Sequence, residues 1–214
     1  MRKMRGLQSV ELTRRPAIRS YDAIVGKKEG EGPLSPYFRH VVEDELFGES
    51  SFEGAERHFF ETAVRLALRR GGLHPTDVRY LLGGDLLNQI ISAGFAARSL
   101  HIPFLGLYGA CSTMAESLAI GSILVDGGYA DTVACAVSSH FSAAERQYRF
   151  PLELGNQRTP TAQWTVTGAG CTVLSDEGEG LCVSGLTIGT VRDYGVTDAN
   201  NMGAAMAPAA ADVL

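Results

Sequence analysis

The residue best suited to chemistry in this sequence is Cys111, which lies in a run of small residues. The run Gly109-Ala110-Cys111-Ser112-Thr113 connects a predicted strand directly to a predicted helix. At the start of a helix, unpaired backbone N–H groups and the positive end of the helix dipole favour a thiolate over a thiol. Cys111 is therefore a candidate nucleophile or part of an anion site. The alternative is a buried structural cysteine in a cramped turn.

The elements that must position this turn alternate between helix and strand. Apolar residues recur at helical spacing in some segments and form short buried runs in others, and the breaks between them fall at glycine pairs or proline. Strands joined by helices of this length pair in parallel through right-handed crossovers. The expected elements are helices over 52–70, 88–100 and 112–125, and strands over 78–82, 104–108 and 132–138.

The pattern changes after Ser139. A polar stretch with Glu145, Arg146 and Gln147, followed by Pro151, Gly155 and Pro160, predicts a long loop, and such loops often bind ligands. Segments 166–174 and 181–191 are expected to pair as antiparallel strands around the turn at 175–178. An alanine-rich helix interrupted by Pro208 is expected from residue 202 onward.

The composition of the chain excludes several classes of function. The chain has 214 residues, a formal net charge of −5 and 45% apolar residues, which is enough to bury an ordinary core. The acidic balance argues against binding to nucleic acid, and no uninterrupted apolar run is long enough to span a membrane. The four cysteines lack the spacing of a zinc site or a disulfide framework, so no metal and no cofactor are predicted. The start of the chain also shows no signal-peptide pattern, so a reducing interior is expected.

The first 30 residues are richer in basic side chains than the rest of the chain. The excess suggests either contact with an anionic membrane surface or, preferably, a solvated arm that lies on an acidic domain, since no amphipathic helix accompanies the charges. The expected organisation is a basic arm over 1–30, an α/β unit over 31–200, and the start of a further helix over 201–214.

Several motifs in one order resemble a known family. The turn around Cys111 resembles the nucleophile turn of the thiolase and 3-oxoacyl synthase superfamily. The full set more narrowly resembles the stage V sporulation protein AD family, from about Gly32 to the last residue. The motifs are Gly84-Asp85-Leu86-Leu87-Asn88-Gln89, Gly109-Ala110-Cys111-Ser112-Thr113, Ser138-Ser139-His140, Ala144-Glu145-Arg146-Gln147, Thr165-Val166-Thr167-Gly168 and the alanine-rich segment 202–212.

The resemblance implies an α/β, thiolase-like fold with a mixed sheet and helices on both faces, of which this chain covers the first of two similar halves. It implies a non-catalytic protein of endospore formers that binds dipicolinic acid, pyridine-2,6-dicarboxylate, with or without calcium, for uptake into the developing spore. The expected location is the cytoplasmic side of the spore inner membrane, beside other membrane proteins of the same uptake system. A homodimer is also implied, joined through an edge strand near the turn, and 132–138 is the candidate strand.

The predicted ligand site comprises Cys111, Ser112, Asn88, His140 and Asp85, with Arg146 and Gln147 as further candidates. A helix N-terminus contributes about 0.3–2 kcal/mol to anion binding, whereas a millimolar to micromolar site needs about 4–8 kcal/mol, so several contacts are required. Asp85 is more simply explained as a cap for a helix start. For His140, lining a pocket and making a structural hydrogen bond remain equally open.

A second hypothesis is an acyl-transferring or condensing enzyme of the thiolase or 3-oxoacyl synthase type, with Cys111 as its nucleophile. The same turn supports both hypotheses. The active members of the superfamily take their catalytic histidine from the second half, so the resemblance does not supply a complete catalytic set within these residues.

Overall fold

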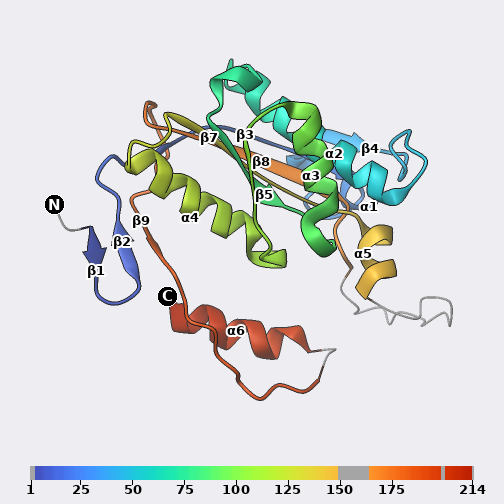
Figure 1. Ribbon diagram of the computed structural model, residues 1–214. Helices are drawn as coiled ribbons and strands as arrows, with labels where there is room; N and C mark the ends of the chain where they lie inside the picture. The colour runs from blue at the N-terminus through green and yellow to red at the C-terminus, as the bar shows by residue number, and fades with distance from the viewer. Residues whose placement is uncertain (1–2, 149–163, 199–200, 214) are drawn as a thin grey trace.

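A six-stranded mixed sheet forms the centre of the protein. The computed structural model describes residues 3–148, 164–198 and 201–213 (Figure 1). The strands of the central sheet lie in the order β4-β3-β8-β7-β5-β6. Their bounds are β3 Ala17–Gly26, β4 His40–Val42, β5 Tyr80–Gly84, β6 Phe104–Gly106, β7 Thr132–Ser139 and β8 Gly168–Ser175.

Helices separate the parallel strands, as the sequence pattern predicts. The strand β5 pairs in parallel with both β6 and β7, while β8 runs antiparallel to β7 and β3. The connecting helices are α2 Phe52–Arg70, α3 Ile91–Leu100 and α4 Thr113–Asp126. Parallel strands need a crossover connection, and these helices supply it. The predicted α/β class and mixed sheet are confirmed.

The helices cover both faces of the sheet (Figure 1). Helices α2 and α3 pack on one face, and α4 packs on the other. Successive strand residues point to opposite faces, so Leu81 joins the α2 and α3 core while Leu82 joins the α4 core. Helix α2 has the bounds that its periodicity predicts, because Ser51 accepts a hydrogen bond from the Gly54 N–H at its start and glycines follow its end.

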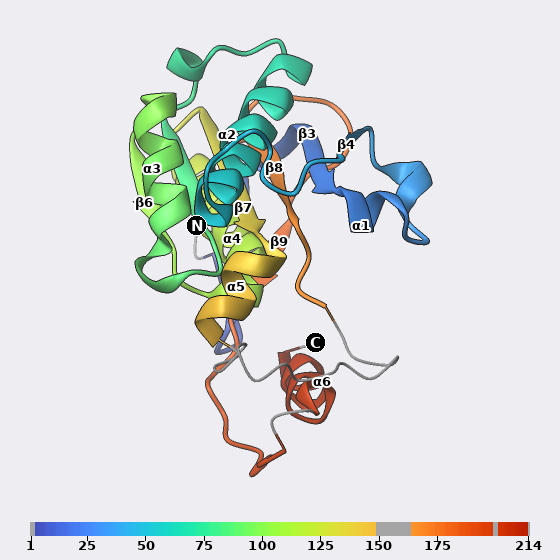
Figure 2. The same ribbon diagram turned by 90° about the vertical axis from the view of Figure 1, so that its right-hand side faces the viewer.

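Smaller elements surround this body. A second sheet contains β1 Met4–Arg5, β2 Ser9–Glu11 and β9 Gly185–Thr187, in that order. Helix α1 covers Lys27–Gly30 and α5 covers Phe141–Tyr148. Helix α6, Met202–Val213, lies apart from the central sheet in both views (Figures 1 and 2). In the described part of the chain, no helix combines the length and the apolar character needed to cross a bilayer.

Two expectations about chain organisation are wrong. Residues 1–30 do not form one arm, because β3 occupies 17–26 and lies between β4 and β8 inside the sheet. Segment 181–191 does not form a hairpin with β8, because β9 pairs with β2 instead. In both cases the strand's partner is remote in sequence, and local patterns carry no information about such pairing.

Three further features of the structure differ from the predictions made from the sequence. The proposed dimer strand, Thr132–Ser139, is an inner strand with β5 and β8 on its two sides, so it offers no free edge. The polar stretch after Ser139 begins as helix α5, and the rest of the predicted loop, 149–163, lies outside the described residues. Helix α6 continues through Pro208 instead of stopping there.

Candidate functional site

The turn that carries Cys111 follows the carboxyl end of β6. After β6, residues Leu107, Tyr108 and Gly109 lead into a short 3-10 helix, Ala110–Ser112, and α4 begins at Thr113. The Ser112 N–H donates to the Gly109 carbonyl at 2.9 Å, which closes this helical turn. The Gly109 N–H donates to the Thr113 hydroxyl at 3.2 Å, and Thr113 is buried at the start of α4. The predicted strand, turn and helix around Cys111 are therefore present.

The turn is tight and closely packed. Ala110 has a φ of 46°, a left-handed conformation that residues with a Cβ adopt at an energetic cost. Gly84, the last residue of β5, packs against this turn. A Cβ at this position would collide with the Leu107 carbonyl oxygen, so only glycine fits. The Leu107 N–H also donates to the Gly83 carbonyl at 2.9 Å. The end of β5 and the approach to Cys111 are thus held in direct backbone contact.

Cys111 is exposed, in contrast to the buried cysteine that the alternative interpretation predicts. The Ser112 hydroxyl donates to the Gly109 carbonyl at 2.8 Å and does not cap the α4 backbone. The N–H groups of α4 therefore donate no hydrogen bond to that side chain, and the Thr113 N–H donates to the Ala110 carbonyl instead. An exposed sulfur next to the positive end of a 14-residue helix is an arrangement that suits an anion or a thiolate.

Two other cysteines are chemically unlike Cys111. Cys135 and Cys171 are buried in the sheet. Burial raises the pKa of Cys135 to about 12 and raises that of Cys171 well above its ordinary value. Neither thiol is set up to act as a nucleophile at neutral pH. Cys182 is exposed, as Cys111 is, but it lies opposite Ala17, at the start of β3.

Asn88 lies beside the Cys111 turn. It belongs to the loop after β5, and its Oδ1 accepts a hydrogen bond of 2.8 Å from the Tyr108 hydroxyl. Both side chains are exposed. The loops after two adjacent parallel strands meet here, at the carboxyl edge where α/β sheets usually bind ligands. The structure therefore brings Asn88, Ser112 and Cys111 into one loop cluster.

Asp85 is buried beneath this cluster and organises its backbone. The carboxylate accepts hydrogen bonds from the Leu87 N–H at 2.8 Å and the Ala93 N–H at 2.6 Å. Burial raises the pKa of Asp85 above its ordinary value, while these N–H donors act in the opposite direction. With 2% of its surface exposed, Asp85 holds the turn into α3 and does not face a ligand. This is the capping role that the sequence analysis preferred.

His140 follows β7 but is also buried. Its Nδ1 accepts a hydrogen bond of 3.1 Å from the Ser142 N–H, so Nε2 carries the proton and donates to the Glu45 carbonyl at 2.8 Å. Burial lowers the pKa of His140, which favours the neutral ring. Both ring nitrogens therefore make structural hydrogen bonds. The side chains of the other two candidates, Arg146 and Gln147, lie outside the described residues.

Glu56 of α2 was not among the residues singled out from the sequence. The Glu56 side chain is fully buried, and its Oε1 accepts a hydrogen bond of 3.2 Å from the Ser138 hydroxyl. Its other oxygen, Oε2, has no hydrogen-bond partner. Burial, followed by the negative charge of Asp85, raises the pKa of Glu56 to about 8. Its position three and four residues before Phe59 and Phe60 is the signal that places it on the apolar face.

The described residues offer no metal centre. Within 3–148, 164–198 and 201–213, no group of three or more His, Cys, Asp or Glu side chains is arranged to hold a metal ion. The site consists of an exposed thiol, a helix N-terminus and a polar loop, supported from beneath by two buried carboxyl groups.

Comparison with known proteins identifies the family. The sequence model of the family described as stage V sporulation protein AD matches residues 6–214. The chain belongs to the stage V sporulation protein AD family. It is also 45% identical, over 197 residues, to the stage V sporulation protein AD of Bacillus subtilis strain 168. That alignment covers 92% of this chain and 58% of the relative, so the chain spans a little over half the length of its curated relative.

The fold is similar to that of two proteins of known structure. The 3-oxoacyl-[acyl-carrier-protein] synthase III of Aquifex aeolicus superposes with a TM-score of 0.54 and 16% identity, over 77% of this chain and 55% of that one. The OleA protein of Xanthomonas campestris, in its H285N form, gives a TM-score of 0.52 and 14% identity, over 75% and 56% of the two chains. At this identity the likeness concerns the fold alone. It confirms the expected thiolase-like architecture.

Proposed function

We propose that this member of the stage V sporulation protein AD family binds dipicolinic acid and serves its uptake into the developing spore. Membership of the family, over residues 6–214, is the observation that carries the proposal. The site chemistry supports it, because a flat dianion needs hydrogen-bond donors and a positive potential. The start of α4 supplies the positive end of a helix dipole beside Cys111. Asn88 in the neighbouring loop and Tyr108 in the turn itself add polar side chains.

Isothermal titration calorimetry on the full-length protein tests this proposal. Dipicolinate should give saturable heat, and Cys111→Ala should weaken binding. Cys182→Ala is the matched control, since it removes an equally exposed thiol away from the loop cluster. Benzene-1,3-dicarboxylate, which keeps the two carboxylates but lacks the ring nitrogen, should bind more weakly. A parallel titration with calcium shows whether the metal takes part. No heat with the wild-type protein would exclude dipicolinate binding.

Acyl transfer is the second candidate function. It is favoured by the exposed Cys111 at the start of α4, since a thiolate in this position is an activated nucleophile. The described residues do not supply an evident base, because both nitrogens of His140 are engaged in structural hydrogen bonds. Incubation with a short acyl-CoA followed by mass spectrometry tests the proposal. A thioester on Cys111 that is lost in Cys111→Ser would establish it, and an unmodified Cys111 would count against catalysis.

A homodimer is part of the same proposal, with β6 replacing the strand named from sequence. The outer edge of β6 is free, because β6 pairs only with β5 in the described sheet. Large apolar side chains are exposed on β6, on the turn after it and on α3, namely Leu105, Tyr108, Ile91 and Phe95. Leu105→Lys on this edge should shift sedimentation toward the monomer, whereas Tyr21→Lys, an equally exposed site on β3, should not.

The proposed location is the cytoplasmic face of the spore inner membrane, next to membrane proteins of the uptake system. A direct contact between the basic N-terminal segment and anionic lipid is testable by vesicle pelleting. Deleting the first 30 residues is unsuitable, because β3 would be lost from the sheet. Replacing Arg14 and Arg15 with glutamine keeps the strand and removes two charges. Equal binding by the variant and the wild type would exclude these arginines from lipid contact.

A further inference from the structure

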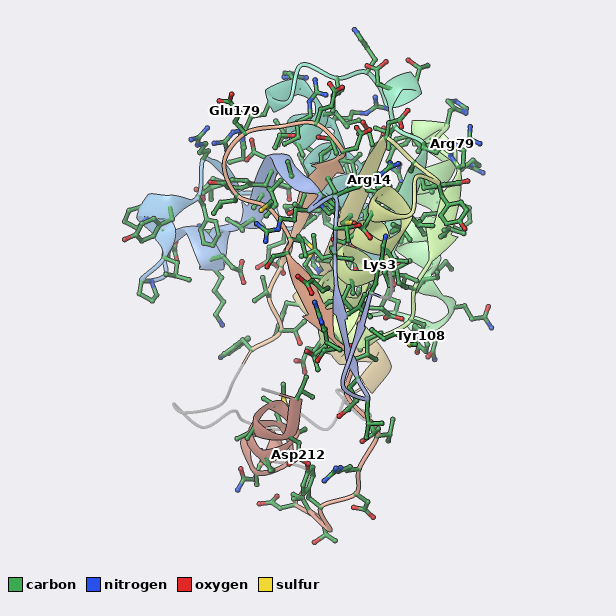
Figure 3. The ribbon with its side chains drawn as sticks, turned by 90° about the vertical axis from the view of Figure 1, so that its left-hand side faces the viewer. Lys3, Arg14, Arg79, Tyr108, Glu179 and Asp212 are labelled. Atoms are coloured by element: carbon green, nitrogen blue, oxygen red, sulfur yellow. The ribbon has the colours of Figure 1, made fainter. Side chains whose placement is uncertain are left out.

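The turn that carries Asn88 rests on two buried carboxyl groups. It follows the carboxyl end of β5, and Figure 3 shows Tyr108, which bonds Asn88, near one end of the central body and Arg79, which precedes β5, near the other. One carboxyl belongs to Asp85 in the turn and the other to Glu56 in α2, and these residues are 2% and 0% exposed. In the described part of the chain, no cation forms an ion pair with either carboxyl.

These two carboxyl groups differ in the donors that surround them. The Asp85 carboxylate accepts from the Leu87 N–H at 2.8 Å and from the Ala93 N–H at 2.6 Å, at the start of α3, where the helix dipole also favours a negative charge. Glu56 accepts a hydrogen bond of 3.2 Å from the Ser138 hydroxyl through Oε1, and its Oε2 has no partner. A buried carboxyl with few donors favours its neutral form. The geometry therefore places the negative charge on Asp85 and a proton on Glu56.

The turn itself is strained and lies in contact with Glu56. Gln89 and Ile90 have φ values of 61° and 48°, a left-handed conformation that is costly for residues with a Cβ and most of all for a branched one. Burial, the largest effect, raises the pKa of Glu56 to about 8, and the backbone of Leu86 in this turn lowers it in part. Ser138, on the other side of the carboxyl, is fixed in the inner strand β7. The turn is therefore the part of these surroundings that can yield.

Within the described residues, no cation offsets the charge that Glu56 would carry on ionisation. The charges that act on it are those of Asp85 and Glu53, and both are negative. The elements that pack against α2 carry other titratable or charged groups, and each is either neutral or has its own partner. They are Asp22 on β3, which pairs with His40 at 3.7 Å; Cys171 on β8, whose pKa is raised by burial; His140 after β7, whose pKa is lowered by burial; Glu145 on α5, which accepts from the Thr165 hydroxyl at 3.3 Å; and Arg98 on α3, which lies over the Phe95 ring.

We propose that neutral Glu56 is a positioning residue for the ligand site. While Glu56 keeps its proton, the charged Asp85 holds the turn over 85–90 closed and presents Asn88. When the proton leaves to solvent, two negative charges face each other in a buried space, the strained turn opens, and binding at Asn88 weakens. The ligand part of this inference rests on the proposed dipicolinate site, to which Asn88 belongs. The opening of the turn does not depend on it.

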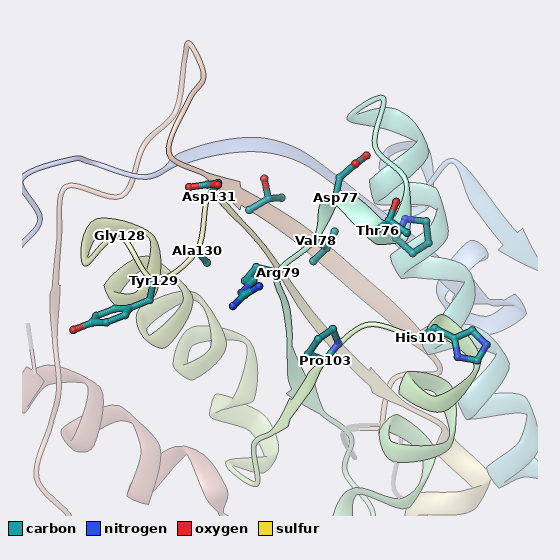
Figure 4. Close-up of a pocket in the computed structure, with 12 residues that line it drawn as sticks. Thr76, Asp77, Val78, Arg79, His101, Pro103, Gly128, Tyr129, Ala130 and Asp131 are labelled. Carbon is teal, nitrogen blue, oxygen red and sulfur yellow. The ribbon is translucent and has the colours of Figure 1, made fainter.

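Native-state hydrogen exchange of the full-length protein without ligand tests the opening of the turn. The closed turn keeps Glu56 protonated up to about pH 8, whereas the open turn returns its pKa toward the ordinary 4.5. After correction for intrinsic rates, protection of the Leu87 and Ala93 amides should fall by up to about tenfold per pH unit from about pH 6 to about pH 8 and then level off. The buried Leu81, whose N–H donates to the Pro103 carbonyl at 2.8 Å, is the reference and should stay better protected. It lies toward the opposite end of β5, where Figure 4 shows Arg79 beside Pro103.

Three variants identify the titrating group. In Glu56→Gln the Leu87 and Ala93 amides should stay protected, with no dependence on pH beyond the intrinsic one. Ser138→Ala removes a hydrogen bond that lowers the pKa of Glu56, so the levelling-off should move to higher pH. Glu61→Gln is the matched control and should behave as the wild type does, because Glu61 lies on the same helix but is paired with Arg65.

Calorimetry with dipicolinate across the same pH range tests the ligand part. The wild-type affinity should be constant up to about pH 7 and weaken about threefold or more by about pH 9, whereas the affinity of Glu56→Gln should stay constant. Both proteins contain Cys111, so ionisation of that thiol affects them equally. The difference between the two profiles therefore isolates Glu56.

Four results would overturn the inference. Protection of Leu87 and Ala93 that is independent of pH in the wild type, or that falls equally in Glu56→Gln, would reject Glu56 as the controlling group. Equal protection of these amides and of Leu81 would show that the turn opens only when the whole protein unfolds. Identical affinity profiles for wild type and Glu56→Gln would disconnect the turn from the ligand. No dipicolinate binding at any pH would reject the proposed function and the ligand part together, while the exchange data would still decide the role of Glu56 in the turn.

Discussion

Replacing Glu56 with glutamine should stabilise the protein at neutral and alkaline pH. Glu56 is fully buried on α2, and its pKa is raised from 4.5 to about 8 by burial and then by the charge of Asp85. Its Oε1 accepts from Ser138, and Oε2 has no partner. Glutamine keeps an acceptor for Ser138 and the same shape. It removes the ability to ionise and places an amide NH2 group at the position of Oε2, which has no hydrogen-bond partner in the wild type.

The sign and size of the effect follow from proton linkage. Between about pH 4.5 and about pH 8 the unfolded chain has lost the Glu56 proton while the folded protein retains it, so the stability of the wild type falls as pH rises. The difference between 4.5 and about 8 corresponds to roughly 5 kcal/mol once both states are ionised. From about pH 5 to about pH 7.5 the wild type should lose roughly 3 kcal/mol relative to Glu56→Gln.

Urea unfolding at a series of pH values measures this difference. The free energies of unfolding of the wild type and Glu56→Gln should converge near pH 4 and separate above pH 5. Glu61→Gln is the control, because Glu61 lies on the same helix but is paired with Arg65 near the surface. Its curve should stay within about 1 kcal/mol of the wild type. Parallel curves for wild type and Glu56→Gln, or a variant that is less stable at every pH, would refute the reasoning.

Three further predictions concern the framework of the site. Asp85→Ala should lower the free energy of unfolding by about 2–3 kcal/mol, because buried N–H groups including that of Ala93 lose their acceptor; a loss under 0.5 kcal/mol in urea unfolding would contradict this. Gly84→Ala should cost roughly 3 kcal/mol or more by driving a Cβ into the Leu107 carbonyl, and an unchanged melting temperature would disprove that collision. Burial raises the pKa of Asp126. The hydrogen bonds that its carboxylate accepts from Lys3 and from the Arg14 N–H have the larger combined effect, so the pKa is lowered overall. The resulting stability is present at neutral pH and disappears as pH falls below the ordinary value of 3.8. Lys3→Met should therefore cost roughly 2 kcal/mol near pH 7 and less near pH 3, and an equal cost at both would argue against the ion pair.

Local patterns predicted most of the elements in the middle of the chain. Helix α2 was found with its true bounds because its periodicity and its terminal glycines agree. Strands β5, β6 and β7 were found within about two residues for similar reasons. The turn at Cys111 was recognisable because a strand, small residues and a helix follow one another directly. These are features of neighbouring residues, which is why the sequence reveals them.

The errors concern residues whose partners are distant in the chain. Strand β3 was assigned to a basic arm because its charges are visible in sequence, while its place between β4 and β8 is not. Glu56 was not singled out from the sequence, and a carboxylate is rarely buried without an ion pair. Only packing against Asp85 and Ser138 reveals its environment.

The sequence by itself determined the alternation of helices and strands, the family and the candidate thiol. Periodicity, turn residues and motifs are properties of consecutive residues, which is why the sequence alone reveals them. Tertiary structure decided which candidates reach solvent. It exposes Cys111, Ser112 and Asn88 in one loop cluster and buries Asp85 and His140 as supports. Burial and the meeting of remote segments depend on how the whole chain packs, so no local pattern specifies them.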